Sequence, residues 1–170
     1  MAKLFYTGGE FVTAPEGQHR AVCVDVTEPE LKPTKFGEKQ LFRVYWQLET
    51  RNEDTAKRFI VSRQFSASMH EKSNFVKMLG SWRGKTYTRE ELEAFRPGGA
   101  GFDSECLVGK NCQINITHSI GTNQNTYANV DHVMKANGDF TLEAEEYVRV
   151  KDRESSGGDG GEGNDDDPGF

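Results

Sequence analysis

Basic and aromatic side chains are interleaved between residues 32 and 65 in a pattern that suits contact with an unpaired nucleic-acid strand. Cations can follow a phosphate backbone, and flat side chains offer surfaces on which bases stack, each stack contributing about 1–3 kcal/mol without sequence preference. Arg43 and Tyr45 share the predicted strand face that lies opposite the apolar one. The candidate nucleic-acid-binding residues are Lys32, Lys35, Phe36, Lys39, Arg43, Tyr45, Arg58, Phe59, Arg63 and Phe65.

The same residues also have a purely structural interpretation. Basic side chains are usually solvated surface, and aromatic side chains in strands are usually core. Phe42 and Trp46 are predicted core. Phe59 and Phe65 alternate with Val61 but also with Arg63, so the sequence leaves their face open.

Metal binding and catalysis are not expected. The residues that could ligate a metal are Cys106, Cys112, His118 and His132. Their spacing lacks the short C-x₂₋₄-C or H-x₃₋₅-H pairs that fix two zinc ligands at once. No G-x-S-x-G or phosphate-cradling loop occurs, and "RPGGAG" follows a predicted helix, whereas a phosphate loop opens one. The sequence therefore predicts a protein without enzymatic activity, metal or cofactor.

Period-two alternation predicts strands over residues 20–27, 41–49, 57–65, 111–119 and 126–135. The stretch 28–40, "EPELKPTKFGEKQ", contains two prolines and a glycine and is predicted to be a long loop. Residues 138–151 are expected to add a terminal strand or an ordered strap.

Two helices are predicted between the third and fourth strands. Phe75, Met78, Leu79 and Trp82 form an apolar stripe in the segment 68–82. Ser68 with Glu71 resembles a capping box for this helix, and Gly80 a stop. A second helix over residues 88–95 has Thr88 as its cap and Glu91 three residues later.

Five short strands with a helix between the third and fourth are typical of an OB-fold. The sequence therefore predicts a mainly β, five-stranded OB-fold barrel with a helical connection between strands 3 and 4 and a disordered acidic tail. The expected division is a binding domain over residues 1–152 and a flexible tail over residues 153–170. OB-folds commonly bind along the second and third strands and the loops beside them.

The net charge of −6 is concentrated at the C-terminal end. Residues 153–170 contain one arginine and six acids, a charge of −5, and residues 1–152 contain 20 basic and 21 acidic residues, a charge of −1. An acidic whole chain therefore does not exclude a nucleic-acid-binding body. From Ser155 to Gly169 no apolar side chain could offset the entropy of ordering, so the tail is expected to be flexible and extended.

The chain is expected to be cytoplasmic. Its N-terminal stretch lacks the apolar region of a signal peptide, and no apolar run approaches the roughly 18–20 residues of a membrane span. The three cysteines are odd in number and form no C-x-x-C pair, which indicates free thiols in a reducing compartment.

The chain ends in "DDDPGF", a bare phenylalanine behind three acids and a turn pair. A Gly-rich acidic tail with a terminal phenylalanine, after an expected OB body, resembles the single-stranded DNA-binding proteins of bacteria and their phages. The bacterial tails end in acids followed by Ile-Pro-Phe. Here the isoleucine is missing and a glycine separates proline from phenylalanine. The residues that match in kind are Asp165, Asp166, Asp167, Pro168 and Phe170.

The body is similar to that of small phage-encoded DNA-binding proteins. The stretches that carry this resemblance are "EKSNFVKMLGSWRGK" (71–85), "LVGKNCQINITHS" (107–119) and "YANVDHV" (127–133). The resemblance implies non-catalytic binding and protection of single-stranded DNA during phage replication or recombination, in the cytoplasm of a bacterial host. It also implies that Phe170 and the neighbouring acids bind replication or repair proteins.

Several alternatives stay open. The body could instead be a β-barrel structural or assembly protein of a virus, with a tail that only keeps it soluble. RNA could replace DNA as the ligand, and the tail acids could fold back and compete with DNA for the protein's own groove. The sequence does not determine the oligomeric state.

Overall fold

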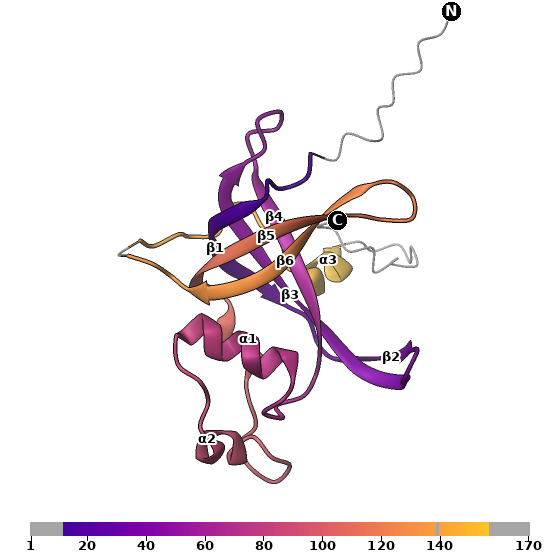
Figure 1. Ribbon diagram of the computed structural model, residues 1–170, viewed down its shortest axis with the longest axis vertical. Helices are drawn as coiled ribbons and strands as arrows, with labels where there is room; N and C mark the ends of the chain where they lie inside the picture. The colour runs from indigo at the N-terminus through magenta and orange to yellow at the C-terminus, as the bar shows by residue number, and fades with distance from the viewer. Residues whose placement is uncertain (1–11, 139, 157–170) are drawn as a thin grey trace, which may run out of the picture.

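The computed structural model describes residues 12–138 and 140–156 (Figure 1). The strands are β1 (Gly17–Val26), β2 (Glu30–Thr34), β3 (Gly37–Arg51), β4 (Arg58–Ser66), β5 (Asn111–Ile120) and β6 (Thr126–Lys135). The helices are α1 (Asn74–Arg83), α2 (Arg89–Glu93), the 3₁₀ turn η1 (Ser104–Leu107) and α3 (Val150–Ser156). The fold is mainly β, as predicted, with the helical segment between β4 and β5.

All six strands belong to one antiparallel sheet with the order β2-β3-β1-β5-β6, and β4 pairs with the other side of β3. Within the part of the chain that the structure describes, β4 and β6 are not paired, so the sheet does not close. Instead, the Arg63 guanidinium of β4 lies 3.4 Å from the Val130 carbonyl oxygen and 3.5 Å from that of Asp131. The predicted five-stranded OB-fold barrel is therefore not confirmed: the described sheet has six strands and does not close.

The sixth strand comes from the segment 28–40, which was predicted to be a loop. β2 pairs with the first residues of β3, so the segment forms a hairpin that extends beyond the body (Figure 1). Pro33 is tolerated because β2 is an edge strand, where its missing N–H removes no bond to an inner neighbour. Gly37 has φ of 99°, a conformation that favours glycine, and Thr34 Oγ1 donates to the Gly37 carbonyl at 2.6 Å. We call residues 30–41 the arm.

The main core lies between the inner face of the sheet and α1. Phe42, Val44, Trp46 and Leu48 of β3 are buried there, as their alternation predicted. The apolar stripe of α1 covers one end of the sheet, and the Trp82 indole donates to the Asn111 carbonyl at 2.9 Å.

The boundaries of α1 differ from the prediction. The N-cap is Ser73, whose hydroxyl accepts from the Val76 amide at 3.1 Å, and Gly84 in the left-handed conformation ends the helix. Ser68 and Gly80 do not have these roles. The predicted capping box of α2 is confirmed, because Thr88 and Glu91 bond each other's backbone amides at 3.2 Å.

A C-terminal segment lies on the outer face of the sheet. Residues 140–150, which we call the strap, cover a second apolar cluster that includes Val22, Val24 and Tyr45. A β-bulge between Cys23 and Asp25 shifts the register of β1, so that Val26 points to the main core while Val22 and Val24 point outward. The strap is therefore part of the folded body. Of the two expectations for residues 138–151, the structure shows an ordered strap and not a terminal strand.

Among the described residues, no helix is long and apolar enough to cross a membrane.

Candidate nucleic-acid interface

The arm places an aromatic ring between two cations at its tip. Phe36 is 76 % exposed, and the ammonium nitrogens of Lys35 and Lys39 each lie 5.5 Å from its ring centroid. The exposed ring gains no stabilisation from burial at this position. A hydrogen bond from the Phe36 amide to Thr34 Oγ1, 3.1 Å long, fixes the backbone of the turn that carries it. The tip therefore presents a flat surface and positive charge together, which is what a base and its phosphate need.

Cross-strand pairing in the arm brings like charges together. Lys32 of β2 lies directly opposite Lys39 of β3. Like charges at directly opposed positions destabilise a strand pair. Glu30, 3.8 Å from the Lys32 ammonium, offsets part of this, but both groups are exposed, where such a pair contributes little. A bound polyanion would relieve the remaining repulsion.

A groove of about 750 Å³ begins where the arm joins the body. One wall comes from β3 and β4, and the other from the segment that leads into α1. Two hydrogen bonds fix that second wall: the Ala67 amide donates to the Gln40 carbonyl at 2.9 Å, and Ser73 Oγ donates to the Ser68 carbonyl at 2.9 Å. The lining residues are Lys39, Gln40, Leu41, Gln64, Phe65, Ser66, Ala67, Ser68, His70, Lys72, Ser73 and Asn74. We call this the arm groove.

His70 and Lys72 were missed as site residues because their segment was predicted to be helical. The signal that could have found them is Ser73 before "NFVKML", a second possible N-cap that starts the helix later. With that start, residues 67–73 become a connecting segment whose exposed polar side chains can line a groove.

A second groove of about 360 Å³ follows the open edge between β4 and β6. Its lining residues are Arg43, Ser62, Arg63, Gln64, Asn129, Val130 and Asp131. We call it the seam groove. Arg43 donates to the Ser62 hydroxyl at 2.7 Å, which orients its guanidinium toward this edge. Gln64 lines both grooves, so the two grooves adjoin at this residue, and we call the arm together with these grooves the basic track.

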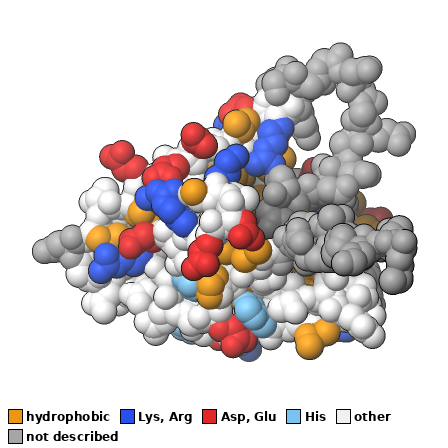
Figure 2. Space-filling view, turned by 90° about the horizontal axis from the view of Figure 1, so that it is seen from above, with side chains coloured by type: hydrophobic (Ala, Val, Ile, Leu, Met, Phe, Trp, Pro, Cys, Tyr) orange, Lys and Arg blue, Asp and Glu red, His pale blue; other side chains and the backbone are white. Residues whose placement is uncertain are grey.

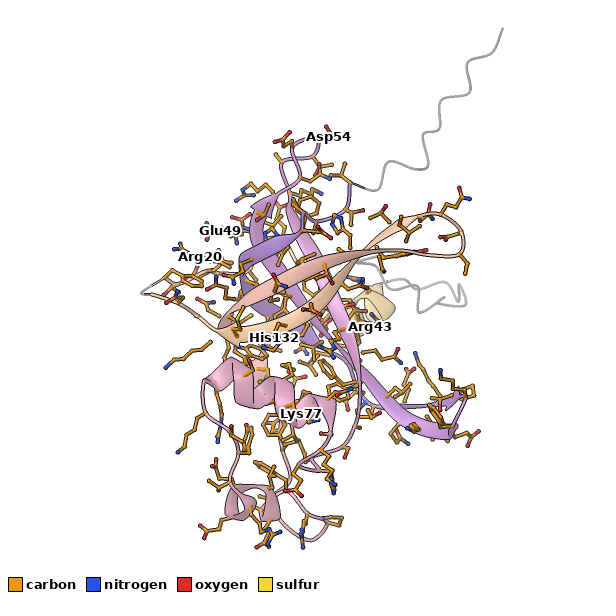
Figure 3. All side chains as sticks on the ribbon, viewed as in Figure 1. Arg20, Arg43, Glu49, Asp54, Lys77 and His132 are labelled. Carbon is orange, nitrogen blue, oxygen red and sulfur yellow. The ribbon has the colours of Figure 1, made fainter. Side chains whose placement is uncertain are left out.

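Figure 3 shows Arg43 on the side of the body from which the arm extends, while Asp54 marks the tip of the β3–β4 hairpin at the other end of the view. Figure 2, seen from above, shows acidic and basic side chains interspersed on that face. Since residues 1–152 carry a charge of only −1, the cations of the basic track are a local feature of the body.

Four of the ten predicted binding residues do not expose their side chains on the basic track. Tyr45 faces outward with Arg43, as predicted, but the strap covers it and leaves it 4 % exposed. Phe65 is 3 % exposed and packs in the main core against Phe42 and Phe75, so it lines the arm groove without offering a face for stacking. The expectation that Tyr45 is exposed is wrong, and Phe65, whose face the sequence left open, is a core residue.

The other two residues pack elsewhere. Phe59 follows the inward alternation of Val61 and Phe65 and is packed against the main core. Arg58 binds the strap, with its guanidinium 3.2 Å from a Glu145 carboxylate oxygen and 2.7 Å from the Glu143 carbonyl oxygen. The remaining six residues lie on the basic track: Lys32, Lys35, Phe36, Lys39, Arg43 and Arg63.

Ionised groups outside the basic track anchor the strap. Asp25 is 1 % exposed and accepts from Arg149 Nε at 2.9 Å, the Val150 amide at 2.8 Å and the Tyr147 hydroxyl at 3.1 Å. Arg149 also bonds the Glu105 carboxylate at 2.7 and 2.8 Å, which lowers the pKa of Glu105. Burial, and then the nearby Asp25 charge, raise the pKa of Tyr147. These groups hold the strap on the outer face of the sheet.

Cys23 and Cys112 are buried and Cys106 is exposed, all as free thiols. Burial raises the pKa of Cys23 to about 12, so this thiol is not a nucleophile at neutral pH. Within residues 12–138 and 140–156, no group of three or more His, Cys, Asp or Glu side chains could hold a metal ion. The predicted partner-binding tip, Asp165 to Phe170, lies outside the described residues.

No family model matches the chain, and no curated protein matches it at a significant level.

Proposed function

We propose that this protein binds and protects single-stranded DNA without catalysis, as a phage-encoded OB-like protein that acts in DNA replication or recombination. The observation that carries the proposal is Phe36, 76 % exposed between two lysines at the end of an arm that continues into a groove. In this reading, the sheet is an OB barrel left open between β4 and β6, and the arm is its extended first loop.

Each part of the basic track has a distinct task. Phe36 stacks a base, and the exposed lysines of the arm meet phosphates at its flanks. The arm groove holds the following nucleotides beside His70 and Lys72. Arg43 and Arg63, at the seam groove, bind the next phosphate with guanidinium groups suited to bidentate contact.

The tail has a separate task. The terminal Phe170 inserts into an apolar pocket of a replication or repair protein, and Asp165, Asp166 and Asp167 meet basic residues around that pocket. The proposal places the protein in the cytoplasm of a bacterial host.

The deciding experiment is fluorescence anisotropy of a labelled oligo-dT titrated with the full chain at low and moderate salt, with duplex DNA and oligo-U as competitors. Neutralising phosphates releases counterions, so the affinity should fall steeply with ionic strength. Tight, salt-sensitive binding that duplex DNA does not displace supports the proposal. Competition by oligo-U decides between DNA and RNA.

A matched pair of variants ties binding to the basic track. Lys35→Gln removes a cation beside Phe36, and Lys57→Gln removes an exposed cation near the β3–β4 turn. We expect Lys35→Gln to reduce the slope of log affinity against log salt by about 1 and Lys57→Gln to leave it unchanged. Absence of binding by the full chain, with and without its tail, would contradict the proposal and favour the structural or assembly protein.

A further inference from the structure

The outer face of the β3–β4 ladder continues past the end of the basic track. Its register pairs are Arg43 with Gln64, Tyr45 with Ser62, Gln47 with Ile60 and Arg51 with Arg58. The first pair and Ser62 line the seam groove, whereas the strap packs on Tyr45 and Ile60 and binds Gln47, Arg51 and Arg58 through Glu145. At about 3.3 Å per residue, the stretch of β3 from Arg43 to Arg51 extends over at most about 26 Å.

Besides the anchor of residues 147–150 at Asp25, two side-chain clasps attach the strap. The Gln47 carboxamide donates to the Glu145 carbonyl at 2.6 Å and accepts from the Glu145 amide at 2.7 Å. The Asn111 carboxamide bonds Leu142 in the same way, with both distances 2.8 Å. These clasps imitate the bonds of a neighbouring strand at single positions, so each of them can open without unzipping a ladder.

The side chains beneath the strap are of the kinds that bind an unpaired nucleic-acid strand, namely guanidinium groups and aromatic rings. The Glu145 carboxylate sits between the guanidinium groups of Arg51 and Arg58, at 2.8 and 3.2 Å, where a phosphate would make the same contacts. The ring of Tyr147 lies 6.5 Å from that of Tyr45, and Phe140 lies 4.7 Å from the Arg20 guanidinium. The strap thus presents a carboxylate and aromatic rings where a strand would present a phosphate and bases.

Three features indicate that the strap fits this face imperfectly. Arg58 Nε is buried and has no hydrogen-bond partner among the described residues, although buried donors are normally paired. Glu146, next to the carboxylate that Arg58 binds, has φ of 45°, an unfavourable conformation for a residue with a Cβ. Leu142 is the one strap residue classed as buried among those described. Local opening is therefore expected at this segment before the rest of the sheet.

We propose that the strap covers the second half of the nucleic-acid track, and that a single strand long enough to pass the seam groove displaces it and binds Tyr45, Gln47, Arg51 and Arg58. This inference rests on the proposed function and adds a covered site to it. Short oligonucleotides would bind the open half alone, whereas longer ones would bind both halves after the strap opens.

The amides of Leu142 and Glu145 report strap docking directly, because they donate to Asn111 and Gln47. Hydrogen exchange at these two amides is measured on the full chain alone, with a short oligo-dT of about 5 nucleotides and with a long one of about 15, within the range of OB-fold site sizes. We expect the long oligonucleotide to speed exchange at both amides and the short one to leave it unchanged. Amides of the β5–β6 ladder serve as the internal reference.

A variant pair tests the same point by affinity. Glu145→Gln removes the carboxylate from Arg51 and Arg58, and Glu146→Gln makes the same change of charge at an exposed neighbour. Because exposed pairs are weak, Glu145→Gln should tighten binding of the long oligonucleotide by about 2- to 5-fold and leave the short one unchanged. Glu146→Gln should change neither.

The outcomes separate this inference from the proposed function. If the long oligonucleotide binds while exchange at Leu142 and Glu145 stays unchanged or slows, the covered site is wrong and the proposed function stands. If no oligonucleotide binds to the full chain or to Glu145→Gln, both are wrong.

Discussion

Phe36 and Ile120 have the same exposed fraction, 76 %, but different surroundings. Phe36 lies between Lys35 and Lys39, whereas Ile120 ends β5 at the turn to β6. A scattered exposed apolar residue is normal and needs no explanation. An exposed aromatic ring with two cations at equal distance is a specific arrangement, and at the scale of single residues it is the strongest indication of a binding surface.

Phe36→Ala is expected to weaken oligo-dT binding by about 5- to 150-fold, the equivalent of one lost base stack. Since the ring makes little buried contact, the urea midpoint should stay unchanged. Anisotropy and equilibrium unfolding measure the two effects. Ile120→Ala is the control of equal exposure, and an equal loss of affinity in both variants would contradict the role given to Phe36.

At the scale of elements, the arm depends on one backbone conformation. Gly37 has φ of 99°, and a Cβ added there would meet no atom within 4 Å, so a substitution acts through the backbone alone. Gly98 has φ of 92° and equally open space, but it lies in the connection after α2. The two glycines therefore allow the same strain to be introduced inside and outside the arm.

Gly37→Ala and Gly98→Ala should each be strained by about 1–2 kcal/mol. We expect Gly37→Ala to distort the turn that orients Phe36. If about 1 kcal/mol of the strain reduces the free energy of binding, oligo-dT affinity falls several-fold. Gly98→Ala should leave binding unchanged. Anisotropy titrations of both variants decide the point, and equal affinities would show that arm geometry does not matter for binding.

Helix α2 gives a pH-dependent prediction. The Glu91 carboxylate accepts from Arg83 at 2.8 and 3.1 Å and from the Thr88 amide at 3.2 Å, and these bonds lower its pKa from 4.5 to about 2. A pKa lowered by folding means that the stabilisation is complete above the unfolded value and is lost as the pH falls toward 2. The difference in free energy of unfolding between wild type and Glu91→Gln should therefore shrink between pH 5 and pH 2.

Urea unfolding at a series of pH values measures this difference. Glu90→Gln, at the neighbouring exposed position in α2, is the control. A difference for Glu91→Gln that stays constant over the whole pH range would contradict the link between Arg83, Glu91 and the helix cap.

At the scale of the whole molecule, the chain has two acidic segments, the strap and residues 157–170, and one basic surface, the basic track. The strap is docked on the outer face through Glu145, and residues 157–170 carry five further acids and no base. Charges of this sign beyond the strap would compete with DNA phosphates for the cations of the basic track, and salt would screen that competition.

Deleting residues 157–170 is therefore expected to raise oligo-dT affinity at low salt and to have little effect at high salt. Anisotropy at two ionic strengths measures this, with a chain whose five tail acids are changed to the corresponding amides as the matched control. Unchanged affinity at low salt would remove tail competition and leave the tail its role in partner binding.

The sequence alone predicted five of the six described strands and the inward face of β3, because alternation with period two shows directly which side chains are buried together. Phe42, Val44, Trp46 and Leu48 are examples. The Thr88–Glu91 capping box was also predictable, since its bonds join residues three apart. The lysines and the ring of the arm were found without knowledge that the segment is a hairpin, because exposure and charge do not depend on its pairing.

Long-range packing decided the rest. Whether Tyr45 is exposed depends on a strap about one hundred residues away in sequence, and whether the sheet closes depends on how β4 approaches β6. Alternation assigns a face to each side chain but does not say what covers that face. The sequence by itself thus determined the composition of the proposed binding surface. Only the tertiary structure decided which of these residues the strap covers, because the clasps of Gln47 and Asn111 and the anchor at Asp25 join segments that no local pattern connects.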